Sequence, residues 1–194
     1  MVNVSQISKV PEADALKRAG KSPGGLPGRD TALLVVDVQE RLAPAIARAP
    51  QVIPRIIALI EKARQAGLPI LATEQYSQGL GPTVAPLRDM LAADEVVEKI
   101  HFAAAREESF QAALAGRGVT RCLVVGMEAH VCVLQTCLAL LARGGTVTLV
   151  ADAVASRDDL NRRLAVARLA RAGAEVTDSA ALLDALGQSA ALSP

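Results

Sequence analysis

The chain has 194 residues, of which 51% are hydrophobic and only 2% aromatic, and its formal net charge is +1. This length suffices for one domain with a full core but is short for two. A core of Ala, Leu, Val and Ile is typical of a parallel sheet between alanine-rich helices. The balanced charge and the absence of a basic run exclude an obvious nucleic-acid surface. No apolar run reaches the roughly 20 residues that span a bilayer.

The first 30 residues are expected to form an arm and a linker, and residues 31–194 to form the domain. A possible helix over residues 12–18 is followed by the breaker-rich run KSPGGLPG at 21–28. The polar and charged start does not resemble a signal peptide. Three cysteines without a CxxC pair leave one over in any disulfide scheme. We therefore expect a cytoplasmic protein with reduced thiols and no membrane partner.

From residue 31 onward, short aliphatic runs alternate with longer segments of helical spacing. The expected strands cover residues 32–38, 70–73, 96–99, 121–125, 146–151 and 175–177. The expected helices cover residues 51–66, 108–115, 130–143 and 159–172, and Gly67, Gly144 and Gly173 follow three of them as left-handed caps. This alternation predicts an α/β fold in which right-handed crossovers place helices on both faces of a parallel sheet. Loops at the carboxyl ends of such strands form the ligand crevice.

Two charged residues are expected at carboxyl ends of strands. Asp37 follows the apolar run LLVV at 33–36, and Lys99 ends the run VVEK at 96–99. Taken singly, Asp37 could cap a turn and Lys99 could extend its charge to the surface. In a shared crevice the ammonium group would instead keep the carboxylate ionised and favour a nearby thiolate.

Cys132 is expected in the first turn of the helix that follows the fourth strand. Unpaired N–H groups and the positive helix end stabilise an anion there, which would lower the cysteine pKa from about 8.5. Cys132 could equally be a buried residue that only packs, which is the role expected for Cys122 and Cys137. As a set, Asp37, Lys99 and Cys132 predict covalent catalysis: Asp37 takes the thiol proton, Cys132 attacks a carbonyl, backbone N–H groups stabilise the oxyanion, and water resolves the thioester-like intermediate.

Several motifs between residues 31 and 183 resemble the isochorismatase-like cysteine hydrolase superfamily, which includes nicotinamidases. They are LLVVDVQERL at 33–42, TEQYSQGLGPT at 73–83, VVEKIHFAA at 96–104, VVGMEAHVCVLQT at 124–136 and VTLVADAVASR at 147–157. The GLGPT loop and the GMEAHVCV turn are most similar to the isochorismatase-domain-containing branch. The resemblance implies a three-layer, Rossmann-like α/β/α fold with six parallel strands in the order 3-2-1-4-5-6.

The resemblance also implies roles for particular residues. It places a catalytic triad on Asp37, Lys99 and Cys132, in agreement with the choice made from the residues themselves. It further implies a cis peptide bond between Met127 and Glu128, with the N–H groups of Glu128 and Cys132 forming an oxyanion hole. The resemblance also implies a homo-oligomer that acts on a small molecule, and the retained cysteine favours an amide or a related compound with a C–N bond as the substrate.

One departure from the family bears on metals. Metal-dependent nicotinamidases carry an Asp and two His after the second strand, whereas residues 74–81 contain no histidine. His101 and His130, the two histidines of the chain, are expected to be hydrogen-bonding residues near the crevice. Neither a catalytic metal nor a cofactor is therefore expected.

Some roles stay open at the level of sequence. Gln39, Tyr76 and Phe102 are candidates for lining the substrate pocket, although each could also have a packing role. Asp152 is expected to be a structural cap for the segment that follows it. Two other functions are compatible with the fold: an isochorismatase-type vinyl-ether hydrolase, whose activity would survive loss of the Cys132 thiol, and an oligomeric binding protein without turnover.

Overall fold

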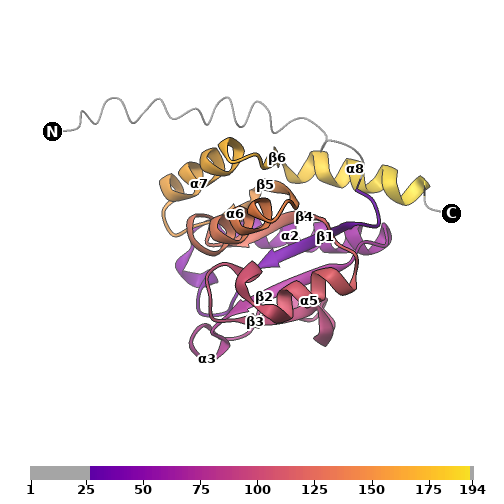
Figure 1. Ribbon diagram of the computed structural model, residues 1–194. Helices are drawn as coiled ribbons and strands as arrows, with labels where there is room; N and C mark the ends of the chain where they lie inside the picture. Colours follow the sequence, from indigo (N-terminus) through magenta and orange to yellow (C-terminus); the bar gives the residue numbers. More distant parts are fainter. Residues whose placement is uncertain (1–26, 193–194) are drawn as a thin grey trace, which may run out of the picture.

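The computed structural model of the chain describes residues 27–192, and their centre is one six-stranded sheet (Figure 1). All neighbouring strands pair in parallel, in the order β3-β2-β1-β4-β5-β6. The strands are β1 (Thr31–Val36), β2 (Ile70–Gln75), β3 (Val96–Lys99), β4 (Arg121–Met127), β5 (Thr146–Ala155) and β6 (Glu175–Thr177). The predicted α/β fold and its strand order are confirmed. The possible helix at residues 12–18 lies outside the described part of the chain.

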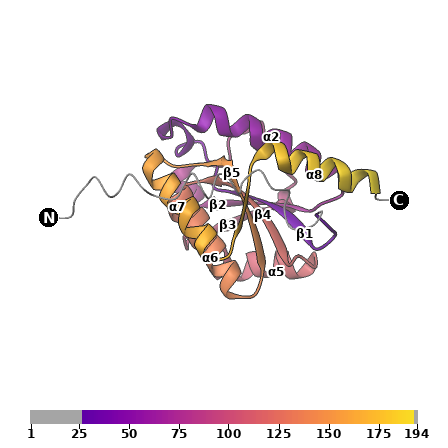
Figure 2. The same ribbon diagram turned by 90° about the horizontal axis from the view of Figure 1, so that it is seen from above.

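The helices form a layer on each face of the sheet (Figure 2). One layer holds α2 (Ala49–Gln65) and α8 (Ser179–Leu192), and the other holds α5 (Glu108–Gly116), α6 (Leu134–Ala142) and α7 (Asp159–Arg171). Shorter elements occupy the loops: η2 (Ala43–Ala45), α3 (Ser77–Leu80), α4 (Ala85–Arg88), η3 (Ala93–Glu95), η4 (Ala104–Arg106) and η5 (Ala129–Val133). The sequence pattern did not predict α8. Within residues 27–192 no helix is long and apolar enough to cross a membrane.

The two cores follow from the alternation of side chains along the strands. In β1, Leu33 and Val35 join the cluster beneath α2 and α8, whereas Leu34 and Val36 join the cluster beneath α5, α6 and α7. Every residue of β1 is buried. Because both faces of the sheet are covered, the central strands are apolar throughout rather than alternating with polar residues.

The element boundaries differ from the predicted ones where the site begins. Strand β1 ends at Val36, two residues early, because Asp37 has a left-handed backbone with φ of 49°. The helix predicted to begin at residue 130 begins as the π-helical turn η5 and continues as α6. The three predicted glycine caps are confirmed, with φ of 69° to 101°.

Candidate active site

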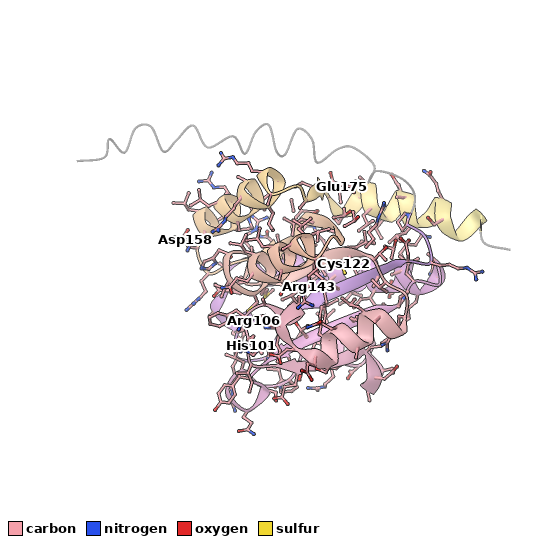
Figure 3. All side chains as sticks on the ribbon, in the orientation of Figure 1. His101, Arg106, Cys122, Arg143, Asp158 and Glu175 are labelled. Atoms are coloured by element: carbon pink, nitrogen blue, oxygen red, sulfur yellow. The ribbon has the colours of Figure 1, made fainter. Side chains whose placement is uncertain are left out.

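Three chemically reactive side chains converge at the carboxyl edge of the sheet. Asp37 directly follows β1, Lys99 is the last residue of β3, and Cys132 lies in η5 behind β4. Figure 3 locates this edge by two labelled residues: His101, just after β3, and Asp158, just before α7. Strands that run in parallel bring their carboxyl ends to the same edge, which explains how residues so distant in sequence meet.

Asp37 and Lys99 form a fully buried ion pair. Lys99 Nζ lies 2.7 Å from Asp37 Oδ2, and neither side chain is exposed to solvent. Thr73, on the neighbouring strand β2, donates a hydrogen bond of 2.6 Å from its hydroxyl to Asp37 Oδ1. Burial raises the pKa of Asp37, and the charge of Lys99 together with these hydrogen bonds only partly offsets that rise. The carboxyl group is therefore a stronger proton acceptor than an exposed aspartate.

A chain of amide side chains orients the ammonium group. Lys99 Nζ donates to Gln75 Oε1 at 2.7 Å, and Gln75 Nε2 donates to the backbone oxygen of Ile100 at 2.7 Å. Gln39 holds the end of β2 in place, because its Oε1 accepts from the Gln75 N–H and its Nε2 donates to the Gln75 and Gly81 carbonyls. Gln39 is fully buried, so it braces the site rather than lining a pocket.

Cys132 differs from the prediction in the direction of its pKa shift. The sequence predicted a lowered pKa at a helix start, but burial raises the pKa of the thiol to about 12. The charge of Asp37 contributes to this rise, whereas Lys99 acts in the opposite direction. The thiol lies close enough to the Asp37 carboxylate and the Lys99 ammonium group for both to shift its pKa. The geometry therefore does not favour a preformed thiolate. It favours a neutral thiol that gives its proton to Asp37 as it reacts.

The residues before Cys132 form a turn of unusual backbone. The peptide bond between Met127 and Glu128 is cis. The Glu128 carbonyl accepts hydrogen bonds from the N–H groups of Val131 and Val133, at 3.0 and 3.3 Å. These bonds fold the backbone around Cys132 and leave its thiol beside Asp37.

Gly126 allows β4 to approach β1 closely just before this turn. It has φ of 120°, and a Cβ placed on it would lie 2.1 Å from the Val36 carbonyl oxygen. Val36 is the residue that precedes Asp37. The contact between the two central strands therefore sets the distance between the carboxylate and the turn that carries Cys132.

Three large, exposed side chains follow the carboxyl ends of β2 and β3. Tyr76, Ile100 and Phe102 are 55%, 77% and 51% exposed. Tyr76 and Phe102, predicted as candidates for the pocket, are thus free to contact a ligand. Ile100 was not predicted, since an isoleucine next to a strand is expected to be buried.

The remaining candidates have structural partners. His101 Nδ1 lies 2.9 Å from Glu107 Oε1, and His130 Nδ1 lies 3.0 Å from Ser156 Oγ. Contrary to expectation, Asp152 does not cap the segment that directly follows it but caps α8, because its carboxylate accepts from both the N–H and the hydroxyl of Ser179. Within residues 27–192 no group of three or more His, Cys, Asp or Glu side chains could hold a metal ion.

Cys122 and Cys137 are packing residues, as predicted. Both are buried and unpaired in the core cluster beneath α5, α6 and α7. Burial raises the pKa of Cys122 to about 12 and raises that of Cys137 as well. Neither has a carboxylate partner comparable to that of Cys132, so neither is a competing nucleophile. Figure 3 shows Cys122 away from the edge marked by His101 and Asp158.

Comparison with known proteins assigns the family. Residues 31–181 match the model of the isochorismatase domain. The chain belongs to the isochorismatase domain family. Isochorismatase domain-containing protein 1 of Salmo salar is 39% identical over 160 residues, which make up 82% of this chain and 56% of that protein. This chain therefore spans little more than half the length of that relative.

Solved structures of related proteins agree with the fold. MAR1 ribonuclease from Caenorhabditis elegans is 37% identical, with a TM-score of 0.77 and coverage of 84% of each chain. YcaC from Escherichia coli, an octameric hydrolase of unknown specificity, is 25% identical, with a TM-score of 0.79 and coverage of 87% and 84%. YcaC from Pseudomonas aeruginosa, solved with covalent acrylamide, is 26% identical, with a TM-score of 0.79 and coverage of 87% and 86%.

Proposed function

We propose that this family member is a metal-independent cysteine hydrolase whose catalytic residues are Asp37, Lys99 and Cys132. The observation that carries the proposal is the buried contact of a thiol with a carboxylate that is itself paired to a lysine. A structural role rarely needs two buried charges beside a thiol, because each costs several kcal/mol to desolvate.

The proposed reaction is acyl transfer from a small amide or a related compound with a C–N bond. Asp37 takes the thiol proton while Cys132 sulfur bonds to the substrate carbonyl carbon. The N–H groups of Glu128 and Cys132 donate to the oxyanion, and Asp37 returns the proton to the leaving nitrogen. Water then hydrolyses the thioester and restores the thiol.

Two observations bear on the substrate. The exposed side chains of Tyr76 and Phe102 favour a ligand with an apolar part. The Pseudomonas aeruginosa neighbour was solved with covalent acrylamide, a small electrophilic amide. Both agree with a small amide as substrate.

The test is the reaction of the full chain with a panel of small aliphatic and aromatic amides, with ammonia release as the readout. We expect at least one amide to be hydrolysed by the wild type, and Cys132→Ala and Asp37→Asn to lose at least a hundredfold in rate. Activity that survives Cys132→Ala would instead indicate vinyl-ether chemistry of the isochorismatase type. If the Cys132 thiol proves no more reactive than that of Cys122 towards iodoacetamide, the proposal is wrong and a binding protein takes its place.

RNA is a second candidate substrate, because of the 37% identity to a protein named as a ribonuclease. The near-neutral charge of the chain does not favour it. End-labelled RNA oligonucleotides distinguish the two: cleavage by the wild type that is lost in Asp37→Asn would move the site to phosphodiester chemistry. We expect no cleavage.

We also propose a homo-oligomer, in which a second copy covers part of the surface formed by Tyr76, Ile100 and Phe102. Ile100 is 77% exposed beside Tyr76 and Phe102, and the Escherichia coli neighbour is an octamer. Light scattering should give a mass above that of one chain, and Ile100→Asp should lower it. The cytoplasmic location stays a prediction.

A further inference from the structure

A two-residue segment, residues 156–157, connects β5 to α7 at the carboxyl edge of the sheet. It is fixed on both sides. The residue before it, Ala155, pairs with Met127 of β4, and the residue after it, Asp158, is the N-cap of α7 and accepts a hydrogen bond of 2.8 Å from the Leu160 N–H. Figure 3 shows Asp158 on the same side of the molecule as His101.

Arg157 holds the carboxylate of Glu128 with its side chain and its backbone. Its Nη2 and Nε atoms donate to Glu128 Oε1 at 2.9 and 3.2 Å, and its N–H donates to Oε2 at 2.9 Å. The Glu128 side chain is only 6% exposed, whereas that of Arg157 is 64% exposed. Although burial alone would raise the pKa of Glu128, the hydrogen bonds and charge of Arg157 lower it. Arg157 is therefore the main partner that holds the carboxylate ionised.

The residue that Arg157 holds also organises the backbone around the nucleophile. We call residues 128–132 the nucleophile turn. Its first residue, Glu128, accepts the N–H groups of Val131 and Val133 on its carbonyl oxygen. The turn has a second link to the same segment, since His130 Nδ1 lies 3.0 Å from Ser156 Oγ. Residues 156–157 thus contact the nucleophile turn at two residues, Glu128 and His130.

We propose that Arg157 is a positioning residue for acyl transfer at Cys132. Through the Glu128 carboxylate it fixes the nucleophile turn so that the N–H groups of Glu128 and Cys132 face the oxygen of the attacked carbonyl. This inference rests on the proposed function. The inference adds to the proposed function an exposed residue, Arg157, that lies outside the catalytic triad and orients the N–H groups that donate to the oxyanion.

A second ion pair in the chain provides a matched control. Arg64, on α2, donates to both carboxylate oxygens of Glu95 at 3.0 and 2.6 Å. Its side chain is 43% exposed and that of Glu95 is 11% exposed, so the pair resembles the one between Arg157 and Glu128. Glu95 directly precedes β3 and thus lies at the amino edge of the sheet, away from the site. Loss of Arg64 should therefore affect stability but not chemistry.

The experiment compares two reactions of the Cys132 thiol. In acylation by p-nitrophenyl acetate, Asp37 takes the thiol proton and the Cys132 sulfur bonds to the ester carbonyl carbon, whose oxygen becomes an oxyanion. The ester C–O bond then breaks and p-nitrophenolate leaves. Alkylation by iodoacetamide displaces iodide without an oxyanion. Only the first reaction uses the N–H groups of the nucleophile turn, for which loss of one donor costs about 100- to 1000-fold in related sites.

We expect Arg157→Gln to slow acylation at least tenfold and to change alkylation less than twofold, both followed by mass spectrometry of the Cys132 peptide. Arg157→Lys should restore part of the acylation rate, and Arg64→Gln should change neither reaction. If acylation and alkylation fall together, or if acylation does not fall, Arg157 has no positioning role. If the wild type is not acylated at all, the proposed function fails, and this inference with it.

Discussion

Lys99 Nζ lies 2.7 Å from Asp37 Oδ2, and both side chains are fully buried. Two charges in this position cost several kcal/mol each to remove from water, and their attraction repays that cost only with good geometry and further hydrogen bonds. Thr73 and Gln75 supply such hydrogen bonds, one to each partner. The pair therefore depends on its neighbours, and changes to either partner should alter both the fold and the Cys132 thiol.

Removal of the two charges should shift the pKa of the Cys132 thiol in opposite directions. Asp37 raises the pKa of the thiol and Lys99 lowers it. We expect Asp37→Asn to lower the pKa of the thiol and Lys99→Met to raise it, each read from the pH dependence of the rate of alkylation by iodoacetamide. Mass spectrometry of the Cys132 peptide measures both rates. Lys62→Met, on α2, is the control and should leave the rate unchanged; shifts of the same sign in the two site variants would contradict the geometry.

The stability of Lys99→Met should depend on pH. Burial raises the pKa of Asp37 in the folded state above the unfolded value of about 3.9. A raised carboxyl pKa stabilises the fold fully below the unfolded pKa, and this stability is lost as pH rises towards the folded pKa. Without the Lys99 charge the loss should be larger. Urea unfolding between pH 3.5 and 7.5 should show the free energy of unfolding of Lys99→Met falling more steeply with pH than that of the wild type; parallel curves would contradict this.

The hydrogen bond from Thr73 should stabilise the charged form of Asp37. Thr73→Val removes a buried hydroxyl that donates at 2.6 Å to a carboxylate, and hydrogen bonds to charged groups contribute about 1.5–3 kcal/mol. We expect a loss of that size in the free energy of unfolding at pH 7, measured with denaturant. Thr73→Ser keeps the hydroxyl and loses only a methyl group, so it should lose less; a loss in Thr73→Ser as large as that in Thr73→Val would contradict a dominant role of the hydrogen bond.

Gly126 should not tolerate a side chain. A Cβ at this position would lie 2.1 Å from the Val36 carbonyl oxygen, and the φ of 120° disfavours other residues. Gly126→Ala should separate β4 from β1, at a cost of about 1–3 kcal/mol, and should lower the alkylation rate of Cys132. Gly116→Ala is the matched control, because it lies in α5 with nothing within 4 Å, and it should be neutral or stabilising by up to about 1 kcal/mol. If the Gly126→Ala protein is as stable as the wild type, β4 does not approach β1 as closely at Gly126 as described.

The amino-acid sequence by itself determined the order of the elements and the edge at which chemistry occurs. Apolar runs, helical spacing and glycine caps are local properties, so the strands and most helices could be predicted to within a few residues. Asp37, Lys99 and Cys132 stand where such runs end, which made them candidates before their distances were known. Helix α8 was missed because its alanine- and leucine-rich sequence has no charged face to mark it as a surface helix.

Only the tertiary structure decided the partners of these residues and the sign of the Cys132 pKa shift. Gln75 and Lys99 are 24 residues apart, and Glu128 and Arg157 are 29 apart, so no local pattern relates them. The position of Cys132 at a helix start predicted a lowered pKa, but burial beside Asp37 outweighs that effect and raises it. Gln39 likewise proved to be a brace because the fold buries it. Burial and charge contacts depend on where distant segments pack. For that reason the reactive residues can be predicted from the sequence, but their protonation states cannot.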